Sequence, residues 1–213
     1  LKDSGAIGNK VAVVNVADAF GIELANAGKP ALEKAGFEIV YESSYPLGTQ
    51  DLAPVISEAK NANPDAFIAF SYPPDTFGLT DQAKIAGLDV AAFYVGVATA
   101  FPAYAGKFGA SAEGVLGAGG VNPDTDEMKA WYKQHEEVTG VGADYWASPV
   151  MYSSLQVLEQ AIERAGTLDR ETVIAELTDG ALATIRGGMA CGGQRQPRVR
   201  DRGQRLRGRP AGG

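Results

Sequence analysis

Residues 65–88 read DAFIAFSYPPDTFGLTDQAKIAGL, and this stretch decides the fold. Its residues 66–70 form a short apolar run with two aromatic side chains, which predicts a buried strand. Residues 71–75 (SYPPD) predict a turn, because two prolines cannot continue a strand ladder. From about Asp75 the pattern indicates a helix that ends at Gly87. The chain on either side repeats this strand-then-helix unit.

The repeat defines the fold class. Further strands are expected at 10–16, 37–45 and 91–97, with a weak one at 114–116. Helices are expected at 22–35 (kinked or restarted at Pro30), 51–62 (capped by Thr49 or Asp51), 127–139, 147–165 and 171–177, and a loop with one turn around Tyr104 at 98–108. Repeated βαβ units imply an α/β fold: a parallel sheet flanked by helices on both faces.

Composition limits the classes of function. The 213 residues suit one domain or slightly more. The sequence contains no run of eighteen apolar residues, so no membrane span is predicted. The chain has one cysteine, Cys191, and one histidine, His135, so neither an internal disulfide nor a Cys/His zinc site can form within it.

Charge divides the chain into two parts. Residues 184–213 hold eight arginines and one acid, a net charge of +7, whereas the whole chain carries −7, so residues 1–183 carry −14. We expect no nucleic-acid binding by the acidic part. The Arg/Gly-rich tail 184–213 is predicted to be disordered. It is either a basic arm that grips a nucleic-acid backbone, or non-native sequence from a reading-frame slip, which its abrupt change of composition favours.

No enzyme motif is present, and the sequence predicts neither catalytic residues, a metal site nor a cofactor. The glycines at 114–120 are not in the order of a dinucleotide-binding loop, and neither a P-loop nor a nucleophile elbow occurs. His135 stands among polar residues of a predicted helix face. The acids at 124–127 are typical of a helix N-terminus.

Candidate ligand contacts follow the predicted strands. Open parallel sheets bind ligands just beyond the carboxyl ends of their strands. Aromatic rings with a few hydroxyl and carboxyl groups suit the wall of a small-molecule pocket. The residues of these types and their neighbours at the strand ends are Asp18, Phe20, Ser71, Tyr72, Asp75, Val97 and Thr99.

The ordered series of features resembles the second lobe of the periplasmic substrate-binding proteins of ABC importers, in the Leu/Ile/Val-binding group with the type I fold. The resemblance covers about residues 5–183. It rests on KVAVV followed by Phe20-Gly21, LEKAG at 32–36 before a strand, a helix at 51–60, NPD at 63–65 before a strand, and QA at 82–83 with GL at 87–88. Residues 145–166 resemble the family's helix that crosses back to the first lobe.

The resemblance implies a domain plan. Residues 5–144 would form one ligand-binding lobe of a two-lobe fold, and the helices of 145–183 would pack on the other lobe. This chain starts where the second lobe starts, and past Ala183 the Arg/Gly tail replaces the expected strands and hinge. We therefore expect a chain that is truncated at the front and altered at the back.

The resemblance also assigns site residues. Phe20 matches an aromatic residue that lies on the ligand, and Tyr72 or Pro73 matches a second such position. Val97 falls where amino-acid binders place an acid for the ligand's ammonium, and a valine cannot pair with that charge. This favours a carboxylate, an amide or another small metabolite, although Asp75 or Asp18 could supply the missing charge.

The implied activity is binding and not catalysis: a solute-binding component closes two lobes around a small molecule and presents it to membrane importer subunits. The resemblance places such a protein in the periplasm, or lipid-anchored at the cell surface. One alternative is the ligand-sensing domain of a receptor or regulator with the same fold. Another is a doubly wound enzyme, which would need the motifs that are missing here.

Overall fold

The computed structural model describes residues 1–179 and 181–190. The chain divides into two compact units, Leu1–Ser153 and a second that starts at Ser154. Each is described by itself below.

The first unit is built on one parallel sheet. Its strands are β1 (Lys10–Val16), β2 (Glu38–Tyr45), β3 (Ala66–Phe70), β4 (Ala92–Val95) and β5 (Val115–Leu116), in the order β2-β1-β3-β4-β5. All four pairings are parallel. The predicted α/β class and the five strands are confirmed, including the weak fifth.

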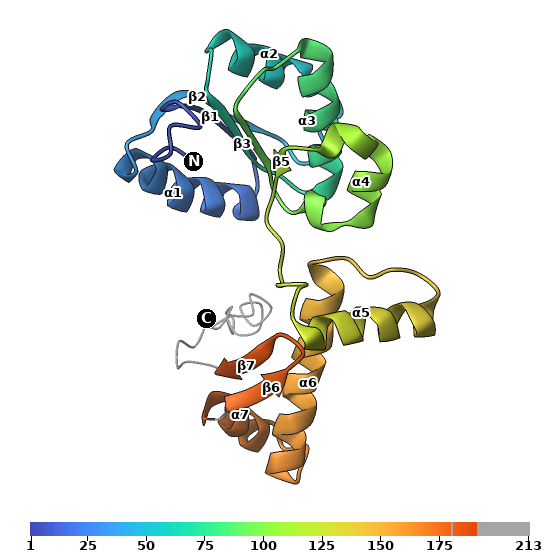
Figure 1. Ribbon diagram of the computed structural model, residues 1–213. Coiled ribbons are helices and arrows are strands. Elements are labelled where there is room, and N and C mark those ends of the chain that lie inside the picture. Colours follow the sequence, from blue (N-terminus) through green and yellow to red (C-terminus); the bar gives the residue numbers. More distant parts are fainter. Residues whose placement is uncertain (180, 191–213) are drawn as a thin grey trace, which may run out of the picture. The chain divides into compact units, whose positions relative to one another are not determined.

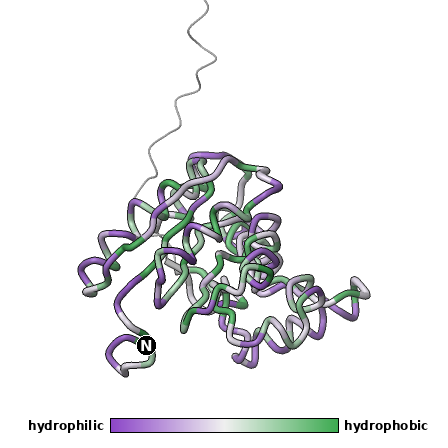
Figure 2. Tube along the Cα trace, turned by 90° about the horizontal axis from the view of Figure 1, so that it is seen from above, coloured by the Kyte–Doolittle hydropathy of each residue, from purple (hydrophilic) through white to green (hydrophobic). Residues whose placement is uncertain are grey.

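Helices cover both faces of this sheet (Figure 1). On one side lies α1 (Ala19–Lys34), and on the other α2 (Ala53–Asn61), α3 (Pro73–Ala86) and α4 (Pro102–Phe108). The side chains of β1 alternate between the two cores: Val11 and Val13 pack with Leu32 of α1, and Ala12 and Val14 pack in the larger core on the other face. Hydrophobic and hydrophilic residues alternate along the helices (Figure 2), as expected for a helix with only one buried face.

The predicted turn at 71–75 is wrong for its second half, because α3 starts at Pro73. Pro73 and Pro74 stand in the first turn, where no backbone N–H is needed for a helical hydrogen bond. Tyr72 is the N-cap and Gly87, in the left-handed conformation, the C-cap. The earlier start brings Asp75 into the first turn of the helix.

Two other helix predictions need correction. Residues 98–108 are not mainly loop: they form a 3-10 turn at Ala98–Ala100 and the helix α4, whose Tyr104 and Phe108 pack on Phe77 of α3. In α1, Pro30 causes no restart, since one helix runs through it. The Pro30 ring removes one backbone N–H donor from the helix, and Pro30 lies on the exposed side of α1.

Neither predicted cap of α2 is confirmed, because its N-cap is Leu52 and no side chain makes a capping hydrogen bond. A side-chain oxygen of Asp51 accepts a hydrogen bond from the backbone N–H of Ala53 at 3.0 Å. Thr49 instead closes the preceding turn on the carbonyl of Pro46.

The first unit continues with α5 (Asp126–Thr139), and α6 (Ala147–Ala165) starts in it. The Thr125 hydroxyl accepts a hydrogen bond from the backbone N–H of Met128 and caps α5. Asp144 accepts hydrogen bonds from the backbone N–H groups of residues 146–148, which fixes the start of α6.

The second unit comprises the rest of α6, α7 (Arg170–Asp179) and a hairpin of β6 (Ala181–Thr184) and β7 (Gly187–Ala190). The Gln160 amide bonds both the N–H and the carbonyl of Ala183, and Gln156 accepts from the N–H of Ile185. A disordered tail from residue 184 is therefore wrong for 184–190, because this hairpin satisfies its backbone on α6. The rest of the predicted tail, 191–213, lies outside the described residues.

Candidate ligand site at the strand ends

Asp18 is fixed where β1 passes into α1. It is the N-cap of α1: its Oδ1 accepts a hydrogen bond from the backbone N–H of Gly21 at 2.9 Å. Its Oδ2 accepts a second hydrogen bond, also at 2.9 Å, from the Tyr72 hydroxyl at the start of α3. The Asp18 carboxylate thus joins the ends of β1 and β3.

The two predicted aromatic contacts lie together. The rings of Phe20 and Tyr72 stack with their centroids 4.6 Å apart and their planes at 22°. Both side chains are half-buried, so each keeps surface free. The hydrogen bond to Asp18, followed by burial, raises the pKa of the Tyr72 hydroxyl, which therefore stays protonated and donates at neutral pH.

Buried polar residues flank Tyr72 in the chain. Ser71 is fully buried, and its hydroxyl bonds that of Thr76 at 2.7 Å. The Asp75 carboxyl is 4% exposed, and its Oδ2 has no hydrogen-bond partner among the described residues. Burial, aided by the charge of Asp18 and opposed by the Tyr72 backbone, raises the Asp75 pKa above its ordinary value. Pro73 is half-buried at the start of α3.

The other strand end meets the same edge of the sheet. Gly96, which follows β4, lies so near Ser71 that a Cβ atom would meet the Ser71 carbonyl oxygen at 2.3 Å. This approach brings the half-buried Val97 beside the end of β3. Thr99, in the 3-10 turn that follows, packs its side chain against Gly117.

The sequence analysis missed Tyr45. It ends β2, is 2% exposed, and its hydroxyl has no partner among the described residues. Burial raises the pKa of this hydroxyl, as does the charge of Asp75. Its position at a strand end was the available signal, but the strand 37–45 held no other residue that pointed to a ligand.

The eight predicted residues therefore divide into three groups. Asp18, Phe20 and Tyr72 are joined by direct contacts, with Pro73 next to them. Asp75 and Ser71 are buried. Val97 and Thr99 stand at the neighbouring strand end. In the described residues no cluster of three or more His, Cys, Asp or Glu side chains could hold a metal ion.

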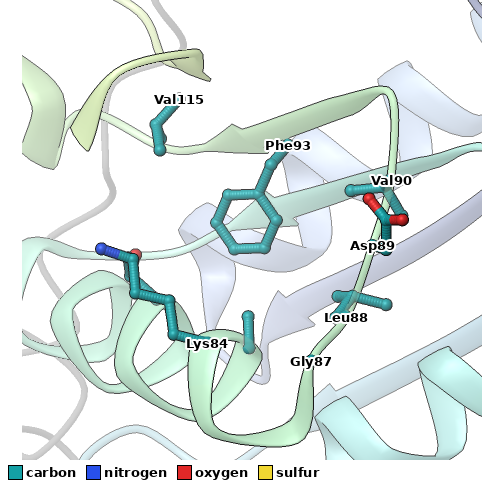
Figure 3. A pocket seen from close by; sticks show the side chains of 9 residues that line it. Lys84, Gly87, Leu88, Asp89, Val90, Phe93 and Val115 are labelled. Atoms are coloured by element: carbon teal, nitrogen blue, oxygen red, sulfur yellow. The ribbon is translucent and has the colours of Figure 1, made fainter. Parts of the chain in front are cut away.

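A separate hollow lies at the opposite end of the strands. It measures about 350 Å³ and is lined by Thr80, Ala83, Lys84, Gly87, Leu88, Asp89, Val90, Phe93 and Val115. The Phe93 ring stands in the middle of it (Figure 3). None of the eight predicted residues lines this hollow.

The model of a periplasmic binding protein family matches residues 1–201. The chain belongs to this family. Among curated proteins, the Leu/Ile/Val-binding protein homolog 4 of Brucella melitensis is 27% identical over 169 residues, which are 76% of this chain and 39% of that protein. The chain thus spans well under two thirds of the length of such relatives. The resemblance to the Leu/Ile/Val-binding group is confirmed.

Solved structures show the same fold. The leucine-, isoleucine-, valine-, threonine- and alanine-binding protein of Brucella ovis, in a closed conformation, has a TM-score of 0.77 at 22% identity, over 89% of this chain and 50% of that one. A solute-binding protein of an R. palustris ABC transporter, in complex with 4-hydroxybenzoate, has a TM-score of 0.75 at 23% identity, over 88% and 52%. The family and fold are those of solute-binding proteins.

In the described part of the chain, no helix combines the length and apolar character that crossing a bilayer requires.

Proposed function

We propose that the protein is the solute-binding component of an ABC-type importer, and that it holds a small molecule at the carboxyl ends of β1, β3 and β4. The observation that carries this proposal is the Phe20–Tyr72 ring pair, which is stacked and fixed to Asp18 at the edge where open parallel sheets bind ligands. Stacked rings offer a flat apolar surface, and the carboxyl and hydroxyl groups beside them add direction.

The ligand is captured between this lobe and a second one. Closure is favoured only by contacts that the ligand makes in the closed state and lacks in the open state. Rings held in place before the ligand arrives lower the entropy cost of those contacts. The closed protein then delivers its ligand to the membrane subunits, and it works in the periplasm or anchored at the cell surface.

The helices of residues 145–183 pack on that second lobe. The apolar face of α6 supports this packing, since Met151, Leu155 and Leu158 are exposed, with Met151 and Leu155 above 60%. Large apolar side chains at helical spacing on one face normally pack on another surface.

The test is isothermal titration of the full chain with leucine, isoleucine, valine and 4-hydroxybenzoate, followed by two variants. Phe20→Ala removes half of the ring pair, and we expect at least a tenfold loss of affinity for any ligand that binds. Tyr72→Phe keeps the stack and removes only the hydroxyl that bonds Asp18, and we expect a smaller loss, about threefold.

A matched control is available in the same lobe. The Tyr41 hydroxyl donates to Glu58 at 2.8 Å, far from the strand ends, so Tyr41→Phe deletes an equivalent hydrogen bond elsewhere. This variant should bind as the parent does. Full affinity in Phe20→Ala would contradict the proposed site.

A further inference from the structure

A polar hollow lies between α1 and the edge strand β2, near the carboxyl ends of β1 and β2. It measures about 370 Å³, and small-molecule sites measure roughly 300–1,000 Å³. Residues of all three elements line it, among them Asn15, Ile22, Lys29, Glu42 and Ser44. None of the eight predicted ligand contacts is part of this lining, so the hollow is distinct from the site of the proposed function.

Asn15 is the residue that the fold itself explains least. It is the one polar residue between Val11 and Val16, and it is only 5% exposed. Its Nδ2 donates to the Val16 carbonyl at 2.9 Å, whereas its Oδ1 accepts no hydrogen bond within the described part of the chain. Burying an amide is costly unless its polar atoms are bonded. Because Asn15 lines the hollow, a molecule there can donate to this oxygen.

The strand register gathers further polar groups around this amide. Asn15 stands directly opposite Ser44 of β2, and Val13 stands opposite Glu42. Opposite residues, and residues two apart on one strand, share a face of the sheet. Asn15, Ser44 and Glu42 therefore lie on the face that α1 covers, where Val13 packs. From α1, Lys29 reaches down to form an ion pair with Glu42.

The charges in the hollow cancel. Among the described residues, only Lys29 and Glu42 bring charges to its lining, and they are paired with each other. A charged ligand would have to separate this pair, whereas an uncharged one leaves it intact. The amide of Asn15 and the hydroxyl of Ser44 offer both donors and acceptors. Ile22, which is 48% exposed, adds an apolar wall beside these polar groups.

We propose that this hollow is a second binding site, which takes an uncharged polyhydroxylated ring such as a monosaccharide or a cyclic polyol. Such a ring has hydroxyl groups around its edge, each a donor and an acceptor, and C–H groups on its faces. The hydroxyl groups bond Asn15, Ser44 and the outer atoms of the ion pair, and one face of the ring packs on Ile22.

The test is an NMR titration of the full chain with probes that share a ring but differ in charge. The uncharged probes are D-glucose, D-galactose and myo-inositol, and the charged ones are D-glucosamine and D-glucuronate. We expect at least one uncharged probe to shift the signals of Asn15, Asn26 and Ser44 saturably. It should bind at least threefold more tightly than either charged probe.

Two variants test the contacts. Asn15→Ala should weaken binding of the uncharged probe at least tenfold, because it removes the buried amide. Ser44→Ala should weaken it about threefold, and it changes only an exposed side chain, so it leaves the fold intact. Ser57→Ala is the matched control, because Ser57 is an exposed serine of α2, on the other face of the sheet. This variant should bind as the parent does.

Three results would overturn the inference: no response to any uncharged probe, equally tight binding of a charged probe, or shifts confined to Phe20 and Tyr72. The last would place the ring at the site of the proposed function. None of the three bears on the binding of leucine or 4-hydroxybenzoate, so the proposed function stands or falls by its own titrations.

Discussion

Replacing Gly21 by alanine tests how the candidate site is built. Gly21 lies in the first turn of α1, beside Asp18 and Phe20, and its N–H donates to Asp18. A Cβ atom there would meet the Val16 carbonyl oxygen at 2.0 Å and a Val16 methyl carbon at 2.8 Å. Both distances are far below van der Waals contact, and the carbonyl belongs to backbone that cannot rotate away. The turn from β1 into α1 must therefore open.

The magnitude follows from two opposing effects. Alanine in place of a helical glycine stabilises by about 1 kcal/mol. Overpacking costs about 1–3 kcal/mol or more, and a clash with backbone belongs at the upper end. We expect a net loss of about 2 kcal/mol. Gly106 is the matched control, because it also lies in a helix, α4, and a Cβ atom there meets nothing within 4 Å. Gly106→Ala should gain up to about 1 kcal/mol.

The assay is urea denaturation followed by the amide NMR signals of β1 and β3. A difference of about 3 kcal/mol between the two variants separates their midpoints by about 1–3 M urea. In Gly21→Ala the signals of Phe20 and Tyr72 should also shift, because the ring pair depends on this turn. Equal midpoints for the two variants would refute the close approach of α1 to β1, and with it the geometry of the site.

Three further changes are predicted. Burial raises the pKa of Asp75, so its protonated carboxyl favours the folded state below about pH 3.8, and this advantage is lost as pH rises through the folded-state pKa. Urea titrations from about pH 3 to 7 should therefore show that Asp75→Asn gains stability relative to the parent as the pH rises. At Asp144, burial tends to raise the pKa, but hydrogen bonds from Ser148 and three backbone N–H groups lower it overall. Asp144→Ala should therefore reduce the free energy of unfolding by about 1–2 kcal/mol at pH 7 and by almost nothing at about pH 2, as measured by circular dichroism. Gly96→Ala brings a Cβ within 2.3 Å of the Ser71 carbonyl oxygen, so it should destabilise the lobe and weaken any ligand binding, whereas unchanged melting would contradict the contact.

The strands of the lobe could be predicted because their signal is local. The run at 10–16 is apolar apart from Lys10 and Asn15, and the run at 66–70 is wholly apolar. Both have residues that pack on each face of the sheet, and the structure places β1 and β3 at the same bounds. Helix starts were less predictable. Pro73 reads as a strand breaker, and only the tertiary position of α3 shows that it opens a helix. The helix α4 was missed because aromatic packing on Phe77 stabilises it.

The candidate site divides in the same way. Asp18, Phe20 and Tyr72 follow predicted strands, and topology alone brings strand ends to one edge of the sheet. The stack and the hydrogen bond between them depend on the approach of α1 and α3, which sequence spacing does not encode. Tyr45 was missed because only the sheet order, with β2 beside β1, brings it near Asp75.

The central claim is that ligands bind at the carboxyl ends of the strands, and the most direct measurement is an amide and aromatic NMR map of the full chain titrated with leucine and with 4-hydroxybenzoate. The account predicts shifts at Asp18, Phe20, Tyr72 and Val97 that saturate together. Shifts confined to Phe93, Val115 and the hollow at the opposite end of the sheet would contradict it.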